Sequence, residues 1–385
     1  RCLCAGDGCS AGACTPAQPI EQVSAGISHT CVIQGGHLWC WGGRGVGETG
    51  LGFATFASPG EVSPRDDLWD VVDAGGYSTC AVRGTEMWCF GSNNGSQLGL
   101  GPRPGNDEPM PVQVPGTTSW SLPGIGRYHS CAIDTSGALW CFGSNSQYSV
   151  GDDAPMGEVE SPVRITAFTG AVTSVSAGAF QTCAISAGRL SCWGWNAYGE
   201  LGNGAMPARA MSPTPIGASL GTWAEVAAGE GHTCARTAAG EVYCWGCGTD
   251  CDACDFGYIE GGIDCTGVIG IGDAAMTYET TPRQVQDLDA QRLAHWNHSC
   301  AIATDGELVC WGPNHRGALG VGDTEPRLVP AAVWPGTRWS DVTVGGEHSC
   351  ALRETGALYC WGHNEHGQLG TGDMTPRLTP QRICL

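Results

Sequence analysis

The stretch EHSCALRETGALYCWGHNEHGQLGTGD, residues 347–373, decides the fold. Its cysteines, Cys350 and Cys360, are ten residues apart, and an aromatic residue and a Gly follow the second one. The same pattern occurs seven times along the 385 residues, at steps of 49 to 66 residues. The cysteine pairs are Cys31 and Cys40, Cys80 and Cys89, Cys131 and Cys141, Cys183 and Cys192, Cys234 and Cys244, Cys300 and Cys310, and Cys350 and Cys360. Such a period indicates an array of one structural unit, numbered here as repeats 1 to 7.

The spacing of each pair predicts a tight β-hairpin with the cysteines directly opposed. Pairs nine residues apart leave two-residue turns, such as Gly35-Gly36, and pairs ten apart leave three-residue turns that end in Gly, such as Gly356. These are the two commonest hairpin turns, and the longer one needs a left-handed residue where Gly stands. Counted outward from the turn, the cysteines fall on a non-hydrogen-bonded pair, where Cα atoms are close enough for a disulfide. We therefore expect one cross-strand disulfide in each repeat.

Each repeat also contains four strand-like segments, which in repeat 7 are WSDVTVGG, SCALR, ALYCWG and RLTPQRI. Four short antiparallel strands, repeated seven times, predict an all-β fold, a seven-bladed β-propeller with four antiparallel strands in each blade. The predicted domains are a Cys-rich arm over 1–19 and a propeller over 20–385, with repeats near 20–62, 69–114, 120–166, 172–216, 223–286, 288–333 and 339–383.

The motifs AG..HTC and G.LYCWG.N..GQLG.GD resemble the regulator of chromosome condensation repeat over roughly residues 20 to 383. This resemblance implies a seven-bladed propeller. The family that this chain resembles includes nuclear exchange factors of a small GTPase, a plant ultraviolet-B photoreceptor with clustered Trp, and secreted bacterial inhibitors of β-lactamases. Some positions depart from the motif: His295 stands in place of a Gly, Arg44 and Gly248 in place of an Asn, and Ser78 and Gln181 in place of the repeat His.

Composition bears on compartment and partners. The net charge of −20 disfavours binding to nucleic acid and to anionic membranes, and no apolar run reaches the length of a membrane helix. The 23 cysteines, at spacings that suit disulfides, favour an oxidising compartment. We therefore expect an acidic, secreted protein, extracellular or at the cell surface. Its partner would be another protein or copies of itself.

Nothing in the repeats forms a catalytic set. One His position recurs beside the second strand, which favours a structural hydrogen-bonding role over a ring of metal ligands: His29, His129, His232, His298 and His348. His315, His363 and His366 lie in variable loops and are expected to be solvated. Asp152, Asp273, Asp323 and Asp373 are expected to cap turns. An interaction module is thus favoured over an enzyme with an active site in the central channel.

Repeat 5 carries the largest insertion, residues 247–265. Its cysteines, Cys247, Cys251, Cys254 and Cys265, are expected to form two local disulfides, with a tetrahedral zinc site as the alternative. Its carboxylates, Asp250, Asp252, Asp255 and Asp264, are candidate ligands for a hard cation such as Ca²⁺, although their spacing does not match an EF-hand loop. No other cofactor is expected.

Five cysteines lie outside the repeats and the insertion: Cys2, Cys4, Cys9, Cys14 and Cys384. An odd number leaves one free, or bonded to another chain. We expect the strand ending at Ile383 to lie beside Ile20 when the ring closes, and Cys384 to join a disulfide with the arm. This arm supports an alternative function, a self-assembling subunit of an extracellular fibre or surface layer.

In antiparallel blades the loops after the first and third strands emerge on one face. The positions after each conserved Gly vary between repeats, and they are the predicted partner-binding residues: Tyr77, Arg127, Tyr128, Phe180, Glu230, Trp296, Asn297 and Glu347. Tyr, Trp and Arg are the residues that most often dominate interface energy. The alternative is that several of these side chains fill the central channel.

Overall fold

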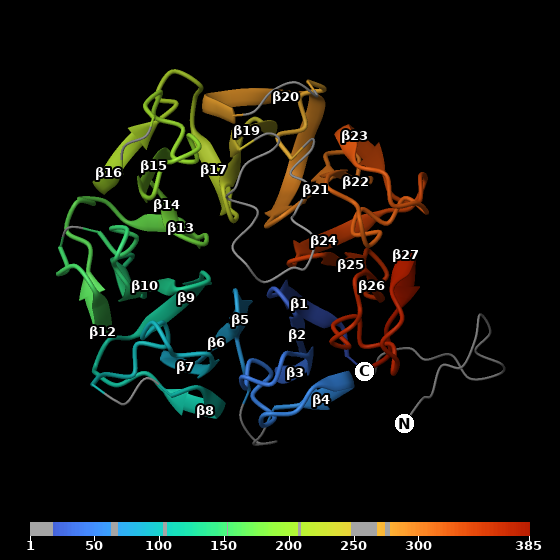
Figure 1. The fold of residues 1–385 in the computed structure, drawn as a ribbon, viewed down its shortest axis with the longest axis horizontal. Coiled ribbons are helices and arrows are strands. Elements are labelled where there is room, and N and C mark those ends of the chain that lie inside the picture. The colour runs from blue at the N-terminus through green and yellow to red at the C-terminus, as the bar shows by residue number, and fades with distance from the viewer. Residues whose placement is uncertain are drawn as a thin grey trace.

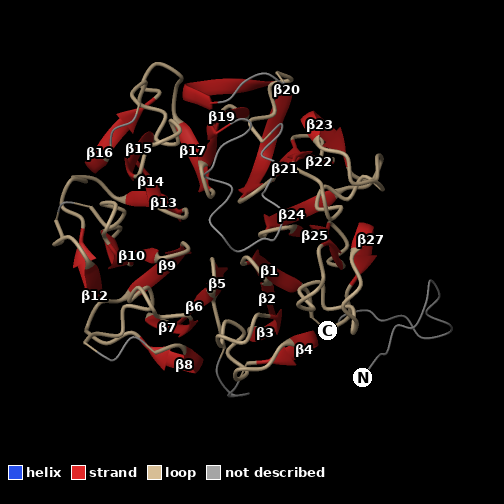
Figure 2. Cartoon of the chain, viewed as in Figure 1, coloured by secondary structure: helices blue, strands red, loops and turns tan. Residues whose placement is uncertain are grey.

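The computed structural model describes residues 18–62, 68–102, 106–151, 153–206, 209–247, 268–273 and 278–385. Its described elements are all β-strands (Figure 2), and none of them is a helix of the length and apolarity that crossing a membrane requires. The strands form five four-stranded antiparallel sheets and one seven-stranded sheet, arranged around a centre as a β-propeller (Figure 1).

The strands fall into four positions from the centre to the rim. The first strands are β1 (Ile20–Ala25), β5 (Val71–Ala74), β9 (Trp120–Ile125), β13 (Val172–Ala177), β17 (Trp223–Ala228) and β24 (Trp339–Val344). The second strands are β2 (His29–Gln34), β6 (Ser78–Arg83), β10 (His129–Asp134), β14 (Gln181–Ser186), β18 (His232–Thr237), β21 (Ser299–Ala303) and β25 (His348–Arg353). The third strands are β3 (His37–Gly42), β7 (Glu86–Gly91), β11 (Leu139–Ser144), β15 (Arg189–Gly194), β19 (Glu241–Cys247), β22 (Leu308–Gly312) and β26 (Leu358–Gly362). The outer strands are β4 (Phe56–Glu61), β8 (Glu108–Gln113), β12 (Glu158–Arg164), β16 (Ala210–Ile216), β23 (Arg327–Ala332) and β27 (Arg377–Arg382).

The seven-stranded sheet arises because β20 (Tyr278–His295) runs through two repeats. Its first part pairs with β19, from Tyr278 opposite Cys247 to Asp289 opposite Glu241. Its last part pairs with β21, from Ala290 opposite Ala303 to His295 opposite Ser299. One continuous strand therefore serves as the outer strand of repeat 5 and the first strand of repeat 6.

The predicted hairpins and disulfides are confirmed. The two cysteines of every repeat are direct cross-strand partners, with Cα atoms 4.0 to 4.2 Å apart, and all seven pairs form disulfides. In the two-residue turn of repeat 1, Gly35 and Gly36 both have positive φ. In the three-residue turns the last residue, Gly137, Gly240, Gly306 or Gly356, has φ between 79° and 103°. Turn chemistry and disulfide position thus agree, as the cysteine spacing predicts.

The hydrophobic core lies between neighbouring sheets. Seven buried clusters each combine side chains from two adjacent repeats. The aromatic residue after the second cysteine is fully buried in each repeat and packs on the preceding one: Phe90, for example, lies in a cluster with Cys31. The outer strands carry prolines, which cannot extend an edge ladder: Pro59, Pro109, Pro111, Pro162, Pro213, Pro215, Pro330 and Pro380.

The two ends of the array meet. Ile383 and Ile20 lie in one cluster together with Trp41 of repeat 1 and Leu369 of repeat 7, as the sequence predicts. The backbone N–H of Gly372 donates to the carbonyl of Ala57, the same bond by which Gly322 reaches the outer strand of the following repeat at Leu378. Repeat 7 is thus joined to repeat 1 by the contacts that join neighbours elsewhere (Figure 1).

Candidate interaction face

The loops after the first strand and after the third strand lie on one face, here named the loop face. In six repeats the residue that follows the Gly of the third-strand motif donates its backbone N–H to a carbonyl of the strand 1–2 loop, for example Ser92 to Tyr77, Trp195 to Phe180 and His363 to Glu347. This bond holds the two loop sets together in each repeat. The prediction that they share a face is therefore confirmed, and all eight predicted partner-binding residues belong to the described residues of these loops.

A ladder of aromatic and Arg side chains crosses repeats 2 to 4 on this face. The Arg127 guanidinium lies 6.0 Å from the ring of Tyr77 and 5.2 Å from the ring of Tyr128. Tyr128 stacks on Phe180, with ring centres 5.1 Å apart and an interplanar angle of 23°. The three aromatic side chains are half-buried, so their rings combine fixed positions with accessible surface.

Arg127 itself is buried, and its guanidinium forms an ion pair with Glu230. Its Nη1 atom lies 2.5 Å from Oε1 of Glu230, and the two side chains are 3% and 8% exposed. The pair joins repeat 3 to repeat 5, and Ala179, which occupies the corresponding position of repeat 4, leaves room between them. Burial raises the pKa of Glu230, and the charge of Arg127 opposes that rise. The pair therefore holds Arg127 in place between its aromatic neighbours.

Burial separates the eight predicted residues into two groups, and the buried Trp296 packs in the cluster between repeats 6 and 7. Arg127, Glu230 and Trp296 are buried, and we withdraw them as residues presented directly to a partner. Tyr77, Tyr128, Phe180, Asn297 and Glu347 remain half-buried on the loop face. Residues at equivalent positions after the conserved Gly therefore differ in burial, and the sequence pattern does not reveal which of them are buried.

The sequence analysis missed Tyr148, which lies in the β11–β12 loop beside the ladder. Its φ of 62° is left-handed, and four other repeats have Gly at the corresponding position: Gly47, Gly199, Gly317 and Gly367. A bulky residue in this conformation is strained, and such strain is concentrated at functional sites. The next residue, Ser149, donates from its hydroxyl to the carbonyl of Phe180. Trp195 extends the aromatic surface, with Arg209 5.1 Å from its ring.

The other side of the loop face, over repeats 6, 7 and 1, carries histidines and charged groups. His363 lies between Glu347, at 3.4 Å, and Glu365, at 3.3 Å. The expectation that His363 is solvated is wrong, because its side chain is 12% exposed, and His366 is half-buried as well. His315 is exposed, as expected. The loop face therefore has an aromatic half and a His–carboxylate half.

Four of the five recurring histidines make the expected structural hydrogen bond, whereas the buried Nε2 of His232 has no hydrogen-bond partner among the described residues. His29, His129, His298 and His348 are buried, and each Nε2 lies within 2.9 Å of a Thr or Ser hydroxyl of the following repeat. Burial lowers the pKa of His29, His129 and His298 to about 3. These imidazoles are neutral at physiological pH and lie away from solvent, so they are not suited to acid–base catalysis.

The predicted metal and turn sites can be placed only in part. The candidate ligands Asp250, Asp252, Asp255 and Asp264 lie outside the described residues, as does Asp152. No cluster of three His, Cys, Asp or Glu side chains suited to a metal occurs within the described segments. Asp323 and Asp373 cap their turns as expected, accepting the backbone N–H groups of Glu325 and Thr375.

The cysteines of the insertion and the arm give two results. Cys247 is disulfide-bonded, as expected, whereas Cys251, Cys254 and Cys265 lie outside the described residues. Cys384 is half-buried and its thiol is free, so the expected disulfide at this residue is not formed. Its candidate partners in the arm, Cys2, Cys4, Cys9 and Cys14, also lie outside the described residues.

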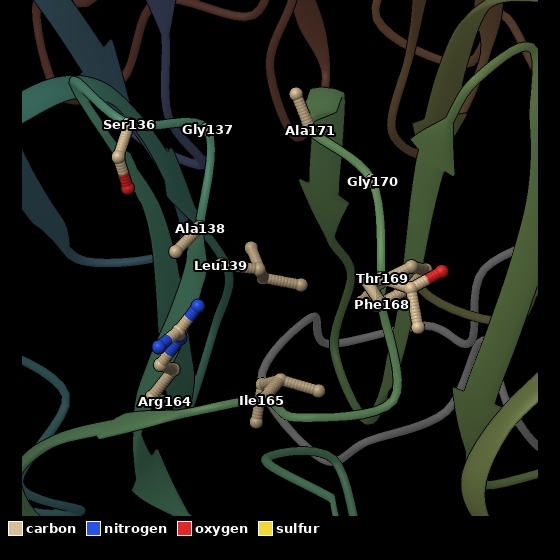
Figure 3. A pocket seen from close by; sticks show the side chains of 10 residues that line it. All are labelled: Ser136, Gly137, Ala138, Leu139, Arg164, Ile165, Phe168, Thr169, Gly170 and Ala171. Atoms are coloured by element: carbon tan, nitrogen blue, oxygen red, sulfur yellow. The ribbon is translucent and has the colours of Figure 1, made fainter.

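A small cavity lies on the opposite, hairpin face (Figure 3). It has a volume of about 140 Å³ and is lined by residues 136–139, 164–165 and 168–171. Arg164 is the one ionisable side chain among the lining residues, so the cavity offers no acid–base pair.

Comparison with protein-family models identifies the repeat. Two models described as the regulator of chromosome condensation (RCC1) repeat match residues 86–133, 187–236, 305–352 and 355–385, and residues 124–148, 223–250 and 339–368. Together these matches cover more than half of the chain.

Among curated proteins, the ultraviolet-B receptor UVR8 of Arabidopsis thaliana is 31% identical over 220 residues, which are 54% of this chain and 44% of the receptor. The chain thus spans less than half of that relative, and still smaller shares of the HERC ligases that it also matches. Among solved structures, human WBSCR16 superimposes with a TM-score of 0.77 at 21% identity, over 91% of this chain and 94% of that one. Yeast RCC1 (Prp20), solved with Kap60 bound, gives 0.76 at 20% identity, over 95% and 84%. These two structural likenesses concern the fold.

Proposed function

Because the chain belongs to the regulator of chromosome condensation repeat family, we propose that it is a closed seven-bladed propeller that acts as a non-catalytic protein–protein interaction module. The bonds between repeats 7 and 1, and the two pairing partners of β20, support the count of seven blades in a closed ring. The chain spans less than half of its curated relatives, so this function is proposed for the propeller alone.

One observation carries the proposal: half-exposed aromatic rings on the loop face are held in place by a buried ion pair and a strained backbone. Arg127 lies against the rings of Tyr77 and Tyr128, and Phe180 stacks on Tyr128. Tyr148 holds a left-handed conformation that Gly adopts more easily. Rigid aromatic side chains lose little entropy when a partner covers them, so they suit protein recognition. Yeast RCC1 (Prp20), which has a similar fold, has been solved with Kap60 bound to it, and this supports a protein partner.

We place the module outside the cell or at its surface. Each repeat has an oxidised hairpin, and such disulfides persist in oxidising compartments. The free thiol of Cys384 keeps self-assembly as a second candidate, since an unpaired cysteine can link two chains. In that case the partner of the loop face would be a second copy.

Site-specific photo-crosslinking tests the face and identifies the partner. A photoreactive phenylalanine analogue replaces Tyr128 on the loop face, and the matched control probe replaces Thr85 in a hairpin turn of the opposite face. We expect adducts from the Tyr128 probe in the native source material, with mass spectrometry identifying another protein or a second copy. The Tyr128→Ala/Phe180→Ala variant should then bind the purified partner at least tenfold more weakly. Adducts only from the Thr85 probe would overturn the assignment of the face.

A further inference from the structure

Among the described loop residues, His363 is the one whose ring lies between two carboxylates. It begins the β26–β27 loop, and its two ring nitrogens face different groups. Nε2 lies 3.3 Å from Oε2 of Glu365 in the same loop, and Nδ1 lies 3.4 Å from Oε2 of Glu347 in the β24–β25 loop. Nδ1 also lies 3.2 Å from Nε2 of Gln368. One nitrogen of a mostly buried imidazole is therefore shared by an amide and a carboxylate.

The orientation of the Gln368 amide follows from its second bond. Its Oε1 accepts the backbone N–H of His366 at 3.0 Å, which leaves its NH₂ group facing His363. An NH₂ group can only donate, so Nδ1 of His363 accepts in this arrangement and the proton of the neutral ring is on Nε2. A second proton would be added at Nδ1. Nδ1–H and the Gln368 NH₂ group would then be two donors facing each other.

Gln368 also belongs to the contact between the last and the first repeat. The backbone carbonyl oxygen of Gln368, and not its side-chain Oε1, accepts the Thr30 hydroxyl at 2.9 Å and the Trp41 indole N–H at 2.9 Å. The adjacent Gly367 packs so closely on Ala57 that an added Cβ would lie 2.6 Å from its Cα. Gln368 therefore joins the seam through its backbone and His363 through its side chain.

From this geometry we infer that His363 is a proton-operated switch that exchanges the Gln368 bond for an ion pair with Glu347 and thereby couples the loop face to the seam between repeats 7 and 1. The neutral ring accepts from Gln368 and makes no charged pair with Glu347, whose side chain is 16% exposed. The protonated ring donates from Nδ1 to Glu347 and releases the Gln368 side chain. The consequence for partner binding rests on the proposed function, whereas the switch itself is a property of the isolated chain.

The charged groups around His363 come from four loops. Glu347 of the β24–β25 loop and Glu365 favour the imidazolium. Arg316 of the β22–β23 loop opposes it in part, because its Nη1 lies 3.1 Å from Oε1 of Glu365. The neighbouring ring of His366, 5.9 Å away, also faces Arg44 of the β3–β4 loop, and that charge together with burial lowers the pKa of His366. Burial keeps His348, beside Glu347, neutral. The two carboxylates are thus the charged groups nearest to the His363 ring.

The test follows the chain alone through the titration range of histidine, about pH 5 to 8. Selectively labelled protein gives the NMR signals of the His363 ring, the Gln368 side-chain amide and the Trp41 indole N–H. We expect the Gln368 and Trp41 signals to shift with the same midpoint as the His363 ring. Exchange of the Trp41 indole proton with solvent should also become faster on the acidic side.

Three variants separate the switch from a general effect of acid. His363→Gln should abolish the shifts at Gln368 and Trp41, and His315→Gln, in the neighbouring loop, should leave them unchanged. Glu347→Gln should weaken the response at Gln368 and Trp41, because it removes the carboxylate to which the protonated Nδ1 would donate. Titration of His363 without any change at Gln368 and Trp41, or shifts that persist in His363→Gln, would overturn the inference. Either result leaves the aromatic half of the loop face, and its crosslinking test, untouched.

Discussion

Nε2 of His29 lies 2.7 Å from the hydroxyl oxygen of Thr79 in the next repeat, and that hydroxyl donates in turn to the carbonyl of Glu48. Because the hydroxyl proton is used by the carbonyl, the imidazole must be the donor, which identifies the tautomer protonated on Nε2. Hydroxyls at the Thr79 position donate to a loop carbonyl of the preceding repeat in all seven repeats. This chain of polar bonds joins the sheets beside their apolar contacts.

The hydroxyl of Thr79 should therefore matter for stability. Thr79→Val keeps the shape of the side chain but leaves the buried His29 N–H and the Glu48 carbonyl without their partner. We expect a loss of about 1–3 kcal/mol in the free energy of unfolding, measured by urea denaturation. The control Thr117→Val, at an exposed turn, should change stability by less than about 0.5 kcal/mol. Equal effects of the two changes would contradict this role.

The buried histidines predict sensitivity to acid. Burial lowers the pKa of His129 to about 3, below its value of about 6.5 in the unfolded chain. The unfolded chain therefore binds the proton first, and the stability present above pH 6.5 is lost as the pH falls toward 3. His129→Gln retains a donor, as Gln181 does at the same position of repeat 4, but cannot be protonated.

Between pH 7 and pH 5 the wild type should thus lose about 2 kcal/mol more stability than His129→Gln. Buried carboxyl groups act in the opposite direction, because burial raises the pKa values of Asp73 and Glu200 to about 7 and acid then favours the folded state. Both proteins contain these groups, so their effect cancels in the comparison. Parallel stability curves for the two proteins, from urea titrations at each pH, would show that His129 does not contribute.

The hairpin disulfides should each stabilise the fold locally. Cys183 and Cys192 close a loop of about ten residues, which the chain-entropy model values at roughly 2–3 kcal/mol. The double change Cys183→Ser/Cys192→Ser should lower the urea midpoint accordingly without changing the strand content seen by circular dichroism. A variant that loses its fold entirely, or one that loses no stability, would contradict a local role.

Replacing one member of the Arg127–Glu230 pair should lower the free energy of unfolding more than replacing both members. Glu230→Gln leaves a buried guanidinium without its counter-charge, for which we expect a loss of about 3–5 kcal/mol. The double variant Arg127→Met/Glu230→Leu should recover most of that loss, because both charges are gone. A double-mutant cycle from urea unfolding measures the coupling. Additive losses would mean that the two side chains act independently.

A change at Tyr148 should affect partner binding without lowering the stability of the fold. Tyr148→Gly relieves the left-handed strain but gains chain entropy when unfolded, so stability should stay the same or rise by up to about 1 kcal/mol. Affinity for the partner identified by crosslinking should fall, because an aromatic side chain is removed from the loop face. Gly204→Ala, at a positive φ elsewhere in these loops, is the control that should lose stability instead. Unchanged affinity would exclude Tyr148 from the contact.

The sequence alone determined the features that depend on local spacing. Nine or ten residues between cysteines, with Gly at the end of the longer turns, allow only one hairpin register, so the disulfides could be predicted residue by residue. The period of the motif likewise predicted four strands in each repeat. The meeting of Ile383 and Ile20 followed from the same regularity.

Tertiary structure decided what depends on contacts between repeats. In repeat 6 the loop after the first strand is one residue shorter, so Trp296, and not His295, makes the backbone bond that Gly126 makes in repeat 3. His295 then bonds to the Ser299 hydroxyl and lies against His232, with ring centres 3.8 Å apart. Likewise, Arg127 and Glu230 are 103 residues apart in the chain, and their burial could not be read from either neighbourhood. Spacing specifies each hairpin because its bonds are local, whereas the depth and partners of a loop side chain depend on the side chains that other repeats contribute around the ring.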